Sequence, residues 1–539
     1  MTHASVCRSA RLAAMLLLAS VAPSLAQSNA TPASLDFLVG HQAFPETVGT
    51  PRDPGARAAE MKSLQERLAA GGLEKAAASR PIVIQLTAAE RNRIDDTRRA
   101  EQQRYLVGVS KPVGTVIDFT PARTLGKRAA NLNLGAARGT GDAGFFWTAE
   151  VRVPGATAVR LHLTGVDLPR GSELYVYNMA GQAFGPYTGR GPLGDGELHT
   201  NTVFGERLLL QLHSSSERAP RLTLAEVGAM GARFAAPRYK PEGVFDADDL
   251  GSIAKAGNLC SANAACVVNA ACQSNAAVSL AKDAVAGMLF QSGASFYICT
   301  GGLVADTNSA TVIPYFLTAH HCISSSGEAS SLETYFDYET TCSNPNCTQP
   351  YNNTGETVGA TIKASGSTSD YTLLQLSSTP VSPDGVVTYL GWLSTAVANT
   401  NNLGLYRISH PQGSPQAYSE AVVDTTKGTC RTLARGNFIY SRDTVGATEG
   451  GSSGSPVVNS AGQIVGQLYG ACGTNLNDVC DAAHNATVDG AFAVTYPNVA
   501  AFLNPSGGGS CGATGTTCTS NSQCCSNSCK AKAGKKTCS

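Results

Sequence analysis

A glycine–serine turn in the C-terminal half holds the first residues that could do chemistry. Residues 449–458 read Glu-Gly-Gly-Ser-Ser-Gly-Ser-Pro-Val-Val, so Ser453 stands among glycines just before a predicted strand. A serine on such a tight turn is exposed, and the N–H groups of its neighbours can point at one spot. The turn therefore suits a nucleophile beside an oxyanion hole, although most glycine–serine turns are only turns.

A histidine pair and an aspartate precede this turn in the chain. Residues 315–322 are an apolar strand that ends in His320, His321 and Cys322, and Asp370 opens a second, alternating strand. A zinc pair is one interpretation of the histidines, but adjacent side chains on a strand point to opposite faces. Asp370 alone could equally be a turn residue that caps its strand. Histidine, aspartate and serine in this order supply a general base, the group that orients it and a nucleophile.

Four segments carry a family resemblance. Residues 299–304, 317–322, 370–374 and 451–456 resemble motifs of the chymotrypsin-like serine peptidases, and most of all those of the secreted bacterial lysyl endopeptidase branch. The resemblance implies a mainly β domain of two barrels, which we place at residues 256–505. It also implies hydrolysis of peptide bonds through an acyl-enzyme, without a cofactor or metal.

The resemblance assigns a role to each candidate catalytic residue. His321, which adjoins Cys322, is the general base, and His320 is its structural neighbour. Asp370 holds the imidazole in the tautomer that accepts a proton from the serine, and Ser453 is the nucleophile. The backbone N–H groups of Gly451 and Ser453 form the oxyanion hole.

The sequence gives fewer indications of how a substrate is bound than of how it is cleaved. The resemblance makes Tyr469 and Gly470 the edge that pairs with the substrate backbone. Ala447 stands where trypsin-like members carry the acid that holds a basic side chain, so that acid must come from elsewhere. Asp489 and Glu449 are the candidates, and we expect cleavage after lysine or arginine.

The cysteines divide the chain into two parts. None lies between residues 27 and 259, whereas sixteen follow from Cys260 onward, and an even number in an exported chain predicts disulfides. The resemblance implies the pairs Cys299–Cys322, Cys260–Cys472 and Cys266–Cys342. The remaining four cysteines of the domain are outside the family pattern, and we expect Cys272–Cys347 and Cys430–Cys480.

The C-terminal tail forms a unit of its own. Residues 506–510 are a glycine-rich linker, and residues 511–539 hold six cysteines with too few apolar residues for a core. The spacing allows fifteen pairings but resembles the inhibitor cystine knots, or knottins. That resemblance implies Cys511–Cys525, Cys518–Cys529 and Cys524–Cys538, and it leaves the ligand of the tail open.

The N-terminal end predicts export. Residues 1–26 combine two arginines, a short apolar run and a small-x-small cleavage site, as a signal peptide does. No later stretch is apolar enough for a membrane helix. Charge is balanced, with 40 basic and 40 acidic residues, so nothing points to nucleic acid. We therefore expect a secreted protein.

The cysteine-free part, residues 27–255, is predicted to be a pro-region that acts on its own peptidase domain as inhibitor and chaperone. We expect helix over residues 56–110, opened in part by a capping box at Thr87 and Glu90, and a β-sandwich over 140–230. Residues 231–255 read as a linker. His162, His199 and His213 are expected to be ordinary surface or core histidines.

Latency must come from this pro-region. Ser452 precedes the nucleophile where digestive relatives carry an aspartate that pairs with a freed N-terminus, so that activation switch cannot operate. Lys255 is the basic residue nearest the expected start of the mature chain, and cleavage there would release Ala256 as the new N-terminus.

Two other classes of function remain open. The chain could be a secreted binding protein with an inactive peptidase barrel and a tail that recognises a partner, or its β-sandwich could be a carbohydrate- or cell-wall-binding module that stays attached. The presence of His321, Asp370 and Ser453 together favours the enzyme, a serine endopeptidase whose substrates are proteins or peptides.

Overall fold

The computed structural model describes the chain in segments: residues 40–47, 56–95, 104–141, 143–234, 259–260, 263–308, 312–343, 347, 355–380, 385–430, 432–505, 517, 529–532 and 535–538. The expected signal peptide, the knot cysteines Cys511, Cys518, Cys524 and Cys525, the linker 506–510 and Lys255 lie outside these residues. No helix in the described part of the chain has the length and apolar character needed to cross a bilayer.

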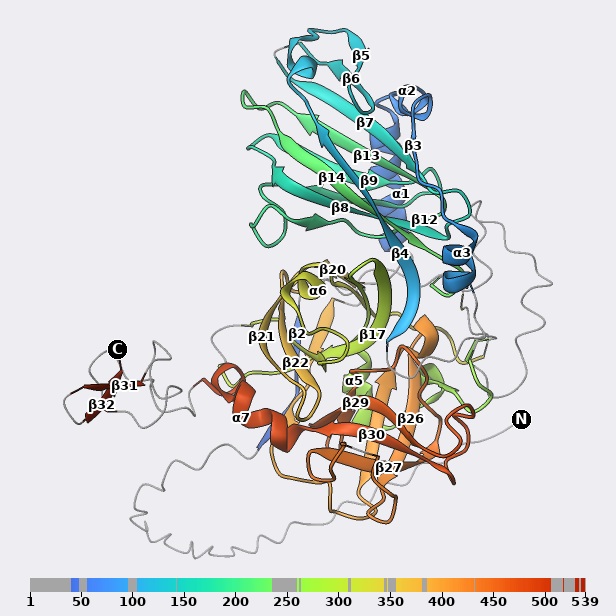
Figure 1. The fold of residues 1–539 in the computed structure, drawn as a ribbon, viewed down its shortest axis with the longest axis vertical. Helices are drawn as coiled ribbons and strands as arrows, with labels where there is room; N and C mark the ends of the chain where they lie inside the picture. The colour runs from blue at the N-terminus through green and yellow to red at the C-terminus, as the bar shows by residue number, and fades with distance from the viewer. Residues whose placement is uncertain are drawn as a thin grey trace, which may run out of the picture. The chain divides into compact units, whose positions relative to one another are not determined.

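Residues 105–230 fold as two facing β-sheets (Figure 1). One sheet has the order β10–β9–β13–β7–β6–β5, with β3 added to β7, and the other contains β11–β8–β14–β4. The bounds in the first sheet are β3 Ile82–Val83, β5 Ala129–Asn131, β6 Ala136–Gly139, β7 Phe145–Arg152, β9 Ser172–Tyr177, β10 Ala183–Tyr187 and β13 Arg207–Ser214. Those in the second are β4 Tyr105–Ile117, β8 Ala158–Asp167, β11 Leu198–His199 and β14 Arg221–Met230.

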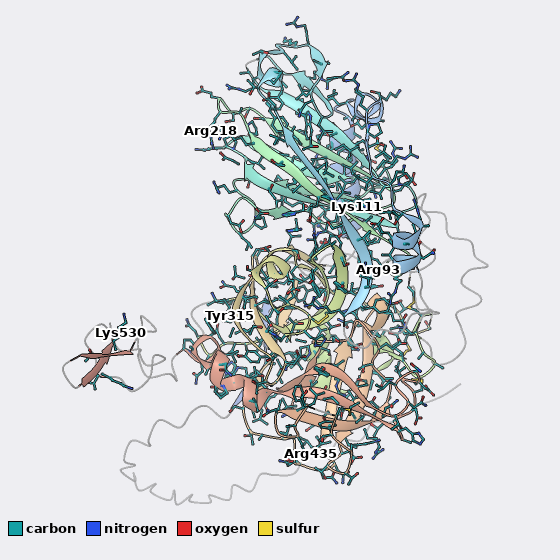
Figure 2. All side chains as sticks on the ribbon, viewed as in Figure 1. Arg93, Lys111, Arg218, Tyr315, Arg435 and Lys530 are labelled. Atoms are coloured by element: carbon teal, nitrogen blue, oxygen red, sulfur yellow. A yellow bond between two sulfur atoms is a disulfide. The ribbon has the colours of Figure 1, made fainter. Side chains whose placement is uncertain are left out.

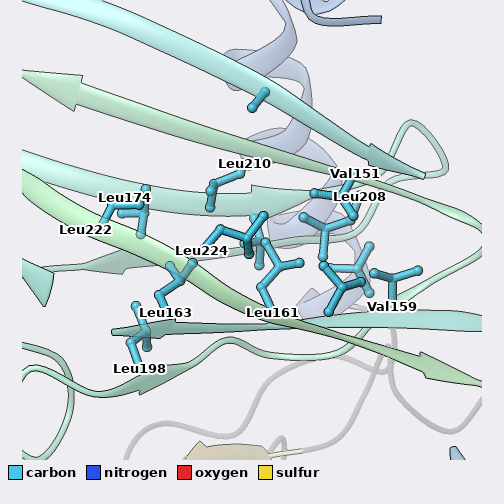
Figure 3. Close-up of a cluster of buried hydrophobic side chains, with 14 of the residues drawn as sticks. Val151, Val159, Leu161, Leu163, Leu174, Leu198, Leu208, Leu210, Leu222 and Leu224 are labelled. Carbon is cyan, nitrogen blue, oxygen red and sulfur yellow. The ribbon is translucent and has the colours of Figure 1, made fainter. Parts of the chain in front are cut away.

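Alternation along the strands builds the core between these sheets. Leu208, Leu210 and Leu212 of β13 are buried, and Leu208 and Leu210 face Leu161 and Leu163 of β8 (Figure 3). Successive side chains of a strand point to opposite faces, so every second leucine enters the space between the sheets. The predicted sandwich is therefore present, and it begins earlier than residue 140 because β4 belongs to it.

Helices precede the sandwich, as expected, but they end sooner. They are α1 Ala56–Ala69, α2 Glu74–Ala78 and α3 Ala88–Asp95. The capping box is formed, since the amide of Glu90 donates to Thr87 Oγ1 and the amide of Thr87 donates to Glu90 Oε2 at 2.8 Å. Lys111 of β4 pairs with Glu90 at 2.7 Å (Figure 2). Helix was wrongly predicted for residues 105–110, which are β-branched and apolar and pair along both edges of β4.

Two of the three histidines of the sandwich lie side by side. His162 and His199 are directly opposite each other on β8 and β11, and their rings stack at 4.0 Å. His162 Nε2 is 2.7 Å from Glu197 Oε2, and burial lowers the pKa of His199 well below its usual value. His213 packs edge-on against Phe146. They are packed and partnered residues, in keeping with the expectation.

The C-terminal half contains a closed six-stranded barrel. Its strands pair in the order β29–β28–β25–β26–β27–β30, and β30 pairs with β29 to close the ring. The bounds are β25 Gly404–Ser409, β26 Ala417–Val423, β27 Phe438–Val445, β28 Pro456–Val458, β29 Ile464–Gly473 and β30 Asn485–Ala491.

A second barrel precedes it in the chain. β17 pairs with β16 and β18, β16 continues to β19 and β20, and β18 continues to β22 and β21. The bounds are β16 Val285–Ser292, β17 Ser295–Leu303, β18 Tyr315–Ala319, β19 Glu333–Phe336, β20 Gly355–Val358, β21 Ala360–Gly366 and β22 Tyr371–Leu376. Only Gly359 separates β20 from β21. Its φ of 84° bends the chain there, so that β20 pairs with β19 and β21 pairs with β22. The predicted mainly β fold with two barrels is confirmed.

A helix follows β30, the last strand of the six-stranded barrel. It is α7 Phe492–Leu503. Its buried residues are Phe492, Thr495, Tyr496, Val499 and Leu503. This spacing of three and four is that of one helix face. Tyr496 packs on Trp392 with ring centres 4.7 Å apart.

The disulfides only partly match the expectation. Cys299–Cys322 is formed. The other four described pairs are Cys260–Cys347, Cys266–Cys480, Cys272–Cys342 and Cys430–Cys472, so Cys260–Cys472, Cys266–Cys342, Cys272–Cys347 and Cys430–Cys480 were wrong. Cys266 and Val267 share a buried cluster with Val479, which brings Cys266 to Cys480 and leaves Cys472 to its neighbour Cys430.

In the tail, the described residues form a short hairpin of β31 Cys529–Lys532 and β32 Lys535–Cys538, in which Cys529 is opposite Cys538. The knottin pairing stays a prediction.

Candidate active site

The histidine–aspartate pair is created by the pairing of two strands. Ala319, the last residue of β18, is opposite Tyr371, the first residue of β22, so the turn after β18 meets the residue before β22. His321 Nδ1 lies 2.7 Å from Asp370 Oδ2, and the amide of His321 donates to Asp370 Oδ1 at 2.8 Å. The carboxylate therefore fixes both the backbone and the ring of His321.

Asp370 is itself held in an unusual conformation. Its φ is 54°, a left-handed value that a non-glycine residue adopts when its surroundings require it. Its carbonyl accepts from the amide of His320 at 3.0 Å and from Gln467 Nε2 at 3.3 Å. Only 4% of the residue is exposed. These contacts join β18, β22 and β29 at a single residue.

The rings of His320 and His321 contact different residues. His320 Nδ1 lies 2.7 Å from the hydroxyl of Ser365, which in turn contacts Thr372 at 2.6 Å. His321 packs edge-on against Tyr469, with ring centres 5.5 Å apart. Its Nε2 atom is buried, and no described residue hydrogen-bonds to it. A shared metal ion is therefore not supported, and the sulfurs next to His321 belong to the Cys299–Cys322 disulfide rather than to free thiolates.

The serine turn is anchored to the strand that carries this disulfide. The amide of Thr300 donates to the carbonyl of Ser453 at 2.8 Å, and the Thr300 hydroxyl donates to the carbonyl of Gly451 at 2.8 Å. Cys322 Sγ also lies 3.7 Å from the Ser453 carbonyl. Strand β17 thus places Ser453 next to the turn that carries His321. The serine was expected to be exposed on its turn. Instead only 3% of Ser453 is exposed, because the turn packs against β17.

Gly454 is needed for this close packing. Its φ is 84°, and a Cβ atom built on it would lie 2.2 Å from Thr318 Oγ1. Its amide donates to the carbonyl of Leu468 at 2.7 Å. Any larger residue would push the serine turn away from β18 and β29. Tyr469 and Gly470 follow on β29, where the sequence predicts the substrate-binding edge.

Neither predicted pocket anion is available for a substrate cation. Asp489 is fully buried on β30, and its two oxygens accept from Arg407 Nε at 3.1 Å and Nη2 at 2.5 Å. Assigning Asp489 to the pocket was wrong, because its charge is already neutralised inside the barrel. Glu449 accepts from Asn263, from the amide of Ala264 and from Gln412 at 2.8–3.1 Å, so it binds the start of the domain. Burial raises the pKa of Glu449.

His410 was not a candidate from the sequence, but it contacts Thr300, the residue that anchors the serine turn. Its amide donates to Thr300 Oγ1 at 3.1 Å, its Nδ1 donates to the carbonyl of Ser414 at 3.0 Å, and its ring stacks on Tyr338. Its carbonyl would lie 2.9 Å from a Cβ atom built on Gly451. A lone histidine before proline carries no signal that would have revealed this role.

Because the ring of His410 is buried, we expect the folded protein to lose stability in acid. Burial lowers the pKa of His410 to about 4. Between its ordinary pKa of 6.5 and this value, the unfolded chain binds a proton that the folded chain does not. The contribution of His410 to the free energy of unfolding is therefore fully present above pH 6.5. It falls as the pH drops towards 4, by about 3 kcal/mol in total.

Urea denaturation at neutral pH and near pH 4.5 measures this loss, and His410→Asn provides the comparison, because asparagine cannot be protonated. The loss on acidification should be smaller in the variant by about 2 kcal/mol. Equal losses in both proteins would show that other groups cause the acid sensitivity.

The comparison with known families gives a match in the C-terminal half of the chain. Residues 260–484 match the family model described as lysyl endopeptidase, C-terminal domain. Over 200 residues the chain is 38% identical to the lysyl endopeptidase of Pseudomonas aeruginosa, a match that covers 35% of this chain and 41% of that protein.

More distant matches accompany this one. The chain is 29% identical over 200 residues to the secreted RxLR effector protein 73 of Plasmopara viticola, covering 35% of this chain and 45% of that protein. The chain thus spans less than half the length of the curated relatives it matches. Among solved structures, the active form of the Rv3671c protease of M. tuberculosis is similar to 43% of this chain over 86% of its own, with 16% identity and a TM-score of 0.28. Deg5 is similar to 42% over 93%, with 10% identity and a TM-score of 0.28.

Proposed function

We propose that the chain is the precursor of a secreted serine endopeptidase in which Ser453 is the nucleophile, His321 the general base and Asp370 the group that orients it. The observation that carries this proposal is the double hydrogen bond from His321 to Asp370, with Nε2 left without a partner among the described residues. A ring held at Nδ1 in this way presents Nε2 as the proton acceptor.

The steps follow from this arrangement. His321 Nε2 takes the proton of the Ser453 hydroxyl while the oxygen attacks the substrate carbonyl, and Asp370 stabilises the imidazolium that forms. The amides of Gly451 and Ser453 bind the developing oxyanion. His321 then gives its proton to the leaving amine, and water hydrolyses the acyl-enzyme by the same route. Catalytic hydrogen bonds tighten when substrate binds, so the serine contact forms in that complex.

A preference for lysine or arginine belongs to the same proposal. The match to the lysyl endopeptidase family model supports it. Asp443 is the remaining acidic candidate, since Asp489 is bonded to Arg407 at 2.5 Å whereas Asp443 lies 4.0 Å from that guanidinium. Asp443 is bonded to Thr487, which is opposite Ala471 on the strand of the predicted substrate edge. A peptide library varied at the residue before the cut tests this preference.

Self-processing provides the test of the proposed function. The full-length protein is expected to yield a mature N-terminus at Ala256, identified by N-terminal sequencing, and the processed domain freed of the pro-region is expected to react with a fluorophosphonate at Ser453. Ser453→Ala should remain full length, because the chain cuts itself after Lys255. Two controls apply. If the wild-type chain takes up no label after processing, the barrel is inactive and a binding role replaces the proposal, and if Ser453→Ala is still cut at Lys255, another protease performs the cleavage.

A further inference from the structure

The ammonium group of Lys427 is bound by three backbone carbonyls. Lys427 lies in the connection between β26 and β27, and its Nζ atom donates to the carbonyls of Ala482, Ala483 and Asn485, each at 2.8 Å. A lysine ammonium has three N–H groups, so these bonds use all of them. The three oxygens carry partial negative charge and converge on one point. We call Lys427 Nζ with these three carbonyls the ammonium cage.

The backbone of Lys427 is held by a second cation. Arg435 (Figure 2) donates to the carbonyl of Lys427 at 2.6 Å and to the carbonyl of Asp424 at 3.1 Å. The guanidinium of Arg435 lies over the ring of Tyr440, 5.0 Å from the ring centre. Asp424 in turn accepts from the amide of Thr426 at 2.9 Å. The turn is therefore fixed at several points, and the lysine side chain reaches the carbonyls from a defined position.

The three carbonyls belong to the end of the connection between β29 and β30, residues 474–484, and to the first residue of β30, Asn485. The disulfide from Cys480 to Cys266 ties this connection to the start of the peptidase domain. Lys427 ties its far end to the connection between β26 and β27. The ammonium cage thus fixes the point at which the chain enters β30.

This end of β30 lies beside the predicted substrate-binding edge. Thr487 follows two residues after Asn485 and is opposite Ala471 on β29. Gly470, which belongs to the predicted edge, immediately precedes Ala471. The Thr487 hydroxyl donates to Asp443 at 2.8 Å. A slip of one residue would turn every side chain of β30 to the opposite face, so bonds at the first residue of the strand keep Thr487 on Asp443.

We infer that Lys427 is a positioning residue for substrate binding and that its ammonium acts as a built-in monovalent cation. It holds the start of β30 in register and so places Asp443, the remaining acidic candidate for a basic substrate side chain. A free cation of similar size, ammonium or potassium, fits between the three carbonyls when the lysine side chain is removed, since rings of carbonyls bind such cations. The effect on substrate binding rests on the proposed function, whereas the occupation of the ammonium cage does not.

Lys427→Ala tests both parts of the inference. The variant is purified in ammonium chloride, so that a cation can fill the ammonium cage during folding. It is then compared in ammonium, potassium and tetramethylammonium chloride at one ionic strength. Tetramethylammonium has the same charge, but it cannot donate a hydrogen bond and is too large to enter between the carbonyls.

The first readout is the hydrolysis of a small peptide ester with lysine before the cut, measured after processing. In tetramethylammonium chloride the KM of Lys427→Ala should rise about 10-fold, which corresponds to one hydrogen bond to a charged group. Its kcat should change little, because the lost interaction serves the ground state and the transition state equally. Ammonium or potassium chloride should restore the KM of the parent.

The second readout is the melting temperature of the full-length Ser453→Ala protein, which needs no activity. Added to this background, Lys427→Ala should melt at a higher temperature in ammonium or potassium chloride than in tetramethylammonium chloride, because a cation that binds only the folded state stabilises it. The parent gives the general effect of each salt. Lys363→Ala is the matched control and should behave as the parent does, since Lys363 Nζ lies over the ring of Phe502 and contacts no part of the ammonium cage.

Lys427→Met covers the case that Lys427→Ala does not fold. It keeps the aliphatic stem without the charge, and because its side chain fills the space, its KM should stay raised in every salt. The inference is overturned if Lys427→Ala shows only the salt effects of the parent, or if Lys427→Met has the KM of the parent. A parent protein that cleaves no ester would contradict the proposed function alone, because the melting comparison still decides whether a cation replaces Lys427.

Discussion

Replacing Ser453 or His321 by alanine should lower kcat about a million-fold, because the members of such a triad act as a unit and removing one is nearly as costly as removing all. Asp370→Asn should be milder, on the order of ten thousand-fold, because the nucleophile and base remain and only the orientation and tautomer of the ring are lost. Single-turnover hydrolysis of a small peptide ester measures all three variants, each cut in the predicted linker by an added protease that is then inhibited, because the inactive variants are not expected to process themselves.

His320→Ala is the matched control for these substitutions. His320 is the neighbour of His321 in the chain, but its ring contacts Ser365 on the other side of the turn. The variant should fold and keep most of its activity. An inactive His320→Ala beside an active His321→Ala would show that the roles of the two histidines must be exchanged.

The second large effect concerns stability. Asp489→Ala should destabilise the peptidase domain by about 3–5 kcal/mol, because it removes the bidentate partner of the fully buried Arg407 guanidinium and leaves it only Asp443, 4.0 Å away. Urea denaturation of the Ser453→Ala protein measures the loss without interference from self-digestion. Loss of folded protein, rather than a change in substrate preference, is thus the expected result at this position.

Two comparisons isolate the charge at this site. Ser441→Ala removes a neutral partner that lies 3.1 Å from Arg407 and should cost only about 1 kcal/mol. The double variant Arg407→Met with Asp489→Leu removes both charges together and should recover most of the lost stability. If Asp489→Ala unfolds at the same urea concentration as the parent, the pair does not hold the barrel together.

The predicted site and the observed one agree where short segments decide the geometry. Asp370 and His321 belong to motifs that begin or end a strand, so the register of β18 on β22 is enough to bring them together. The capping box at Thr87 is likewise complete within four residues. In such places the sequence carries most of the information.

The failures occur where the partner is far away in the chain. Asp489 looked like a free anion because Arg407, which neutralises it, lies 82 residues away. The disulfides failed for the same reason, since Cys266 and Cys480 are 214 residues apart and only the folded path of the chain brings them together. The two valines within residues 105–110 favour a strand, but nothing local shows that two strands from different halves of the chain pair with this segment.

The start of the peptidase domain is fastened by covalent bonds rather than by its terminal amine. Cys260 is bonded to Cys347 and Cys266 to Cys480, while Glu449 receives Asn263 and Ala264 from inside the segment. Leu259 is fully buried in the same cluster, so the anchored start of the domain begins at Leu259. The proposed cut therefore has a tolerance in position: products that begin at different residues upstream of Leu259 would all carry the same anchored start.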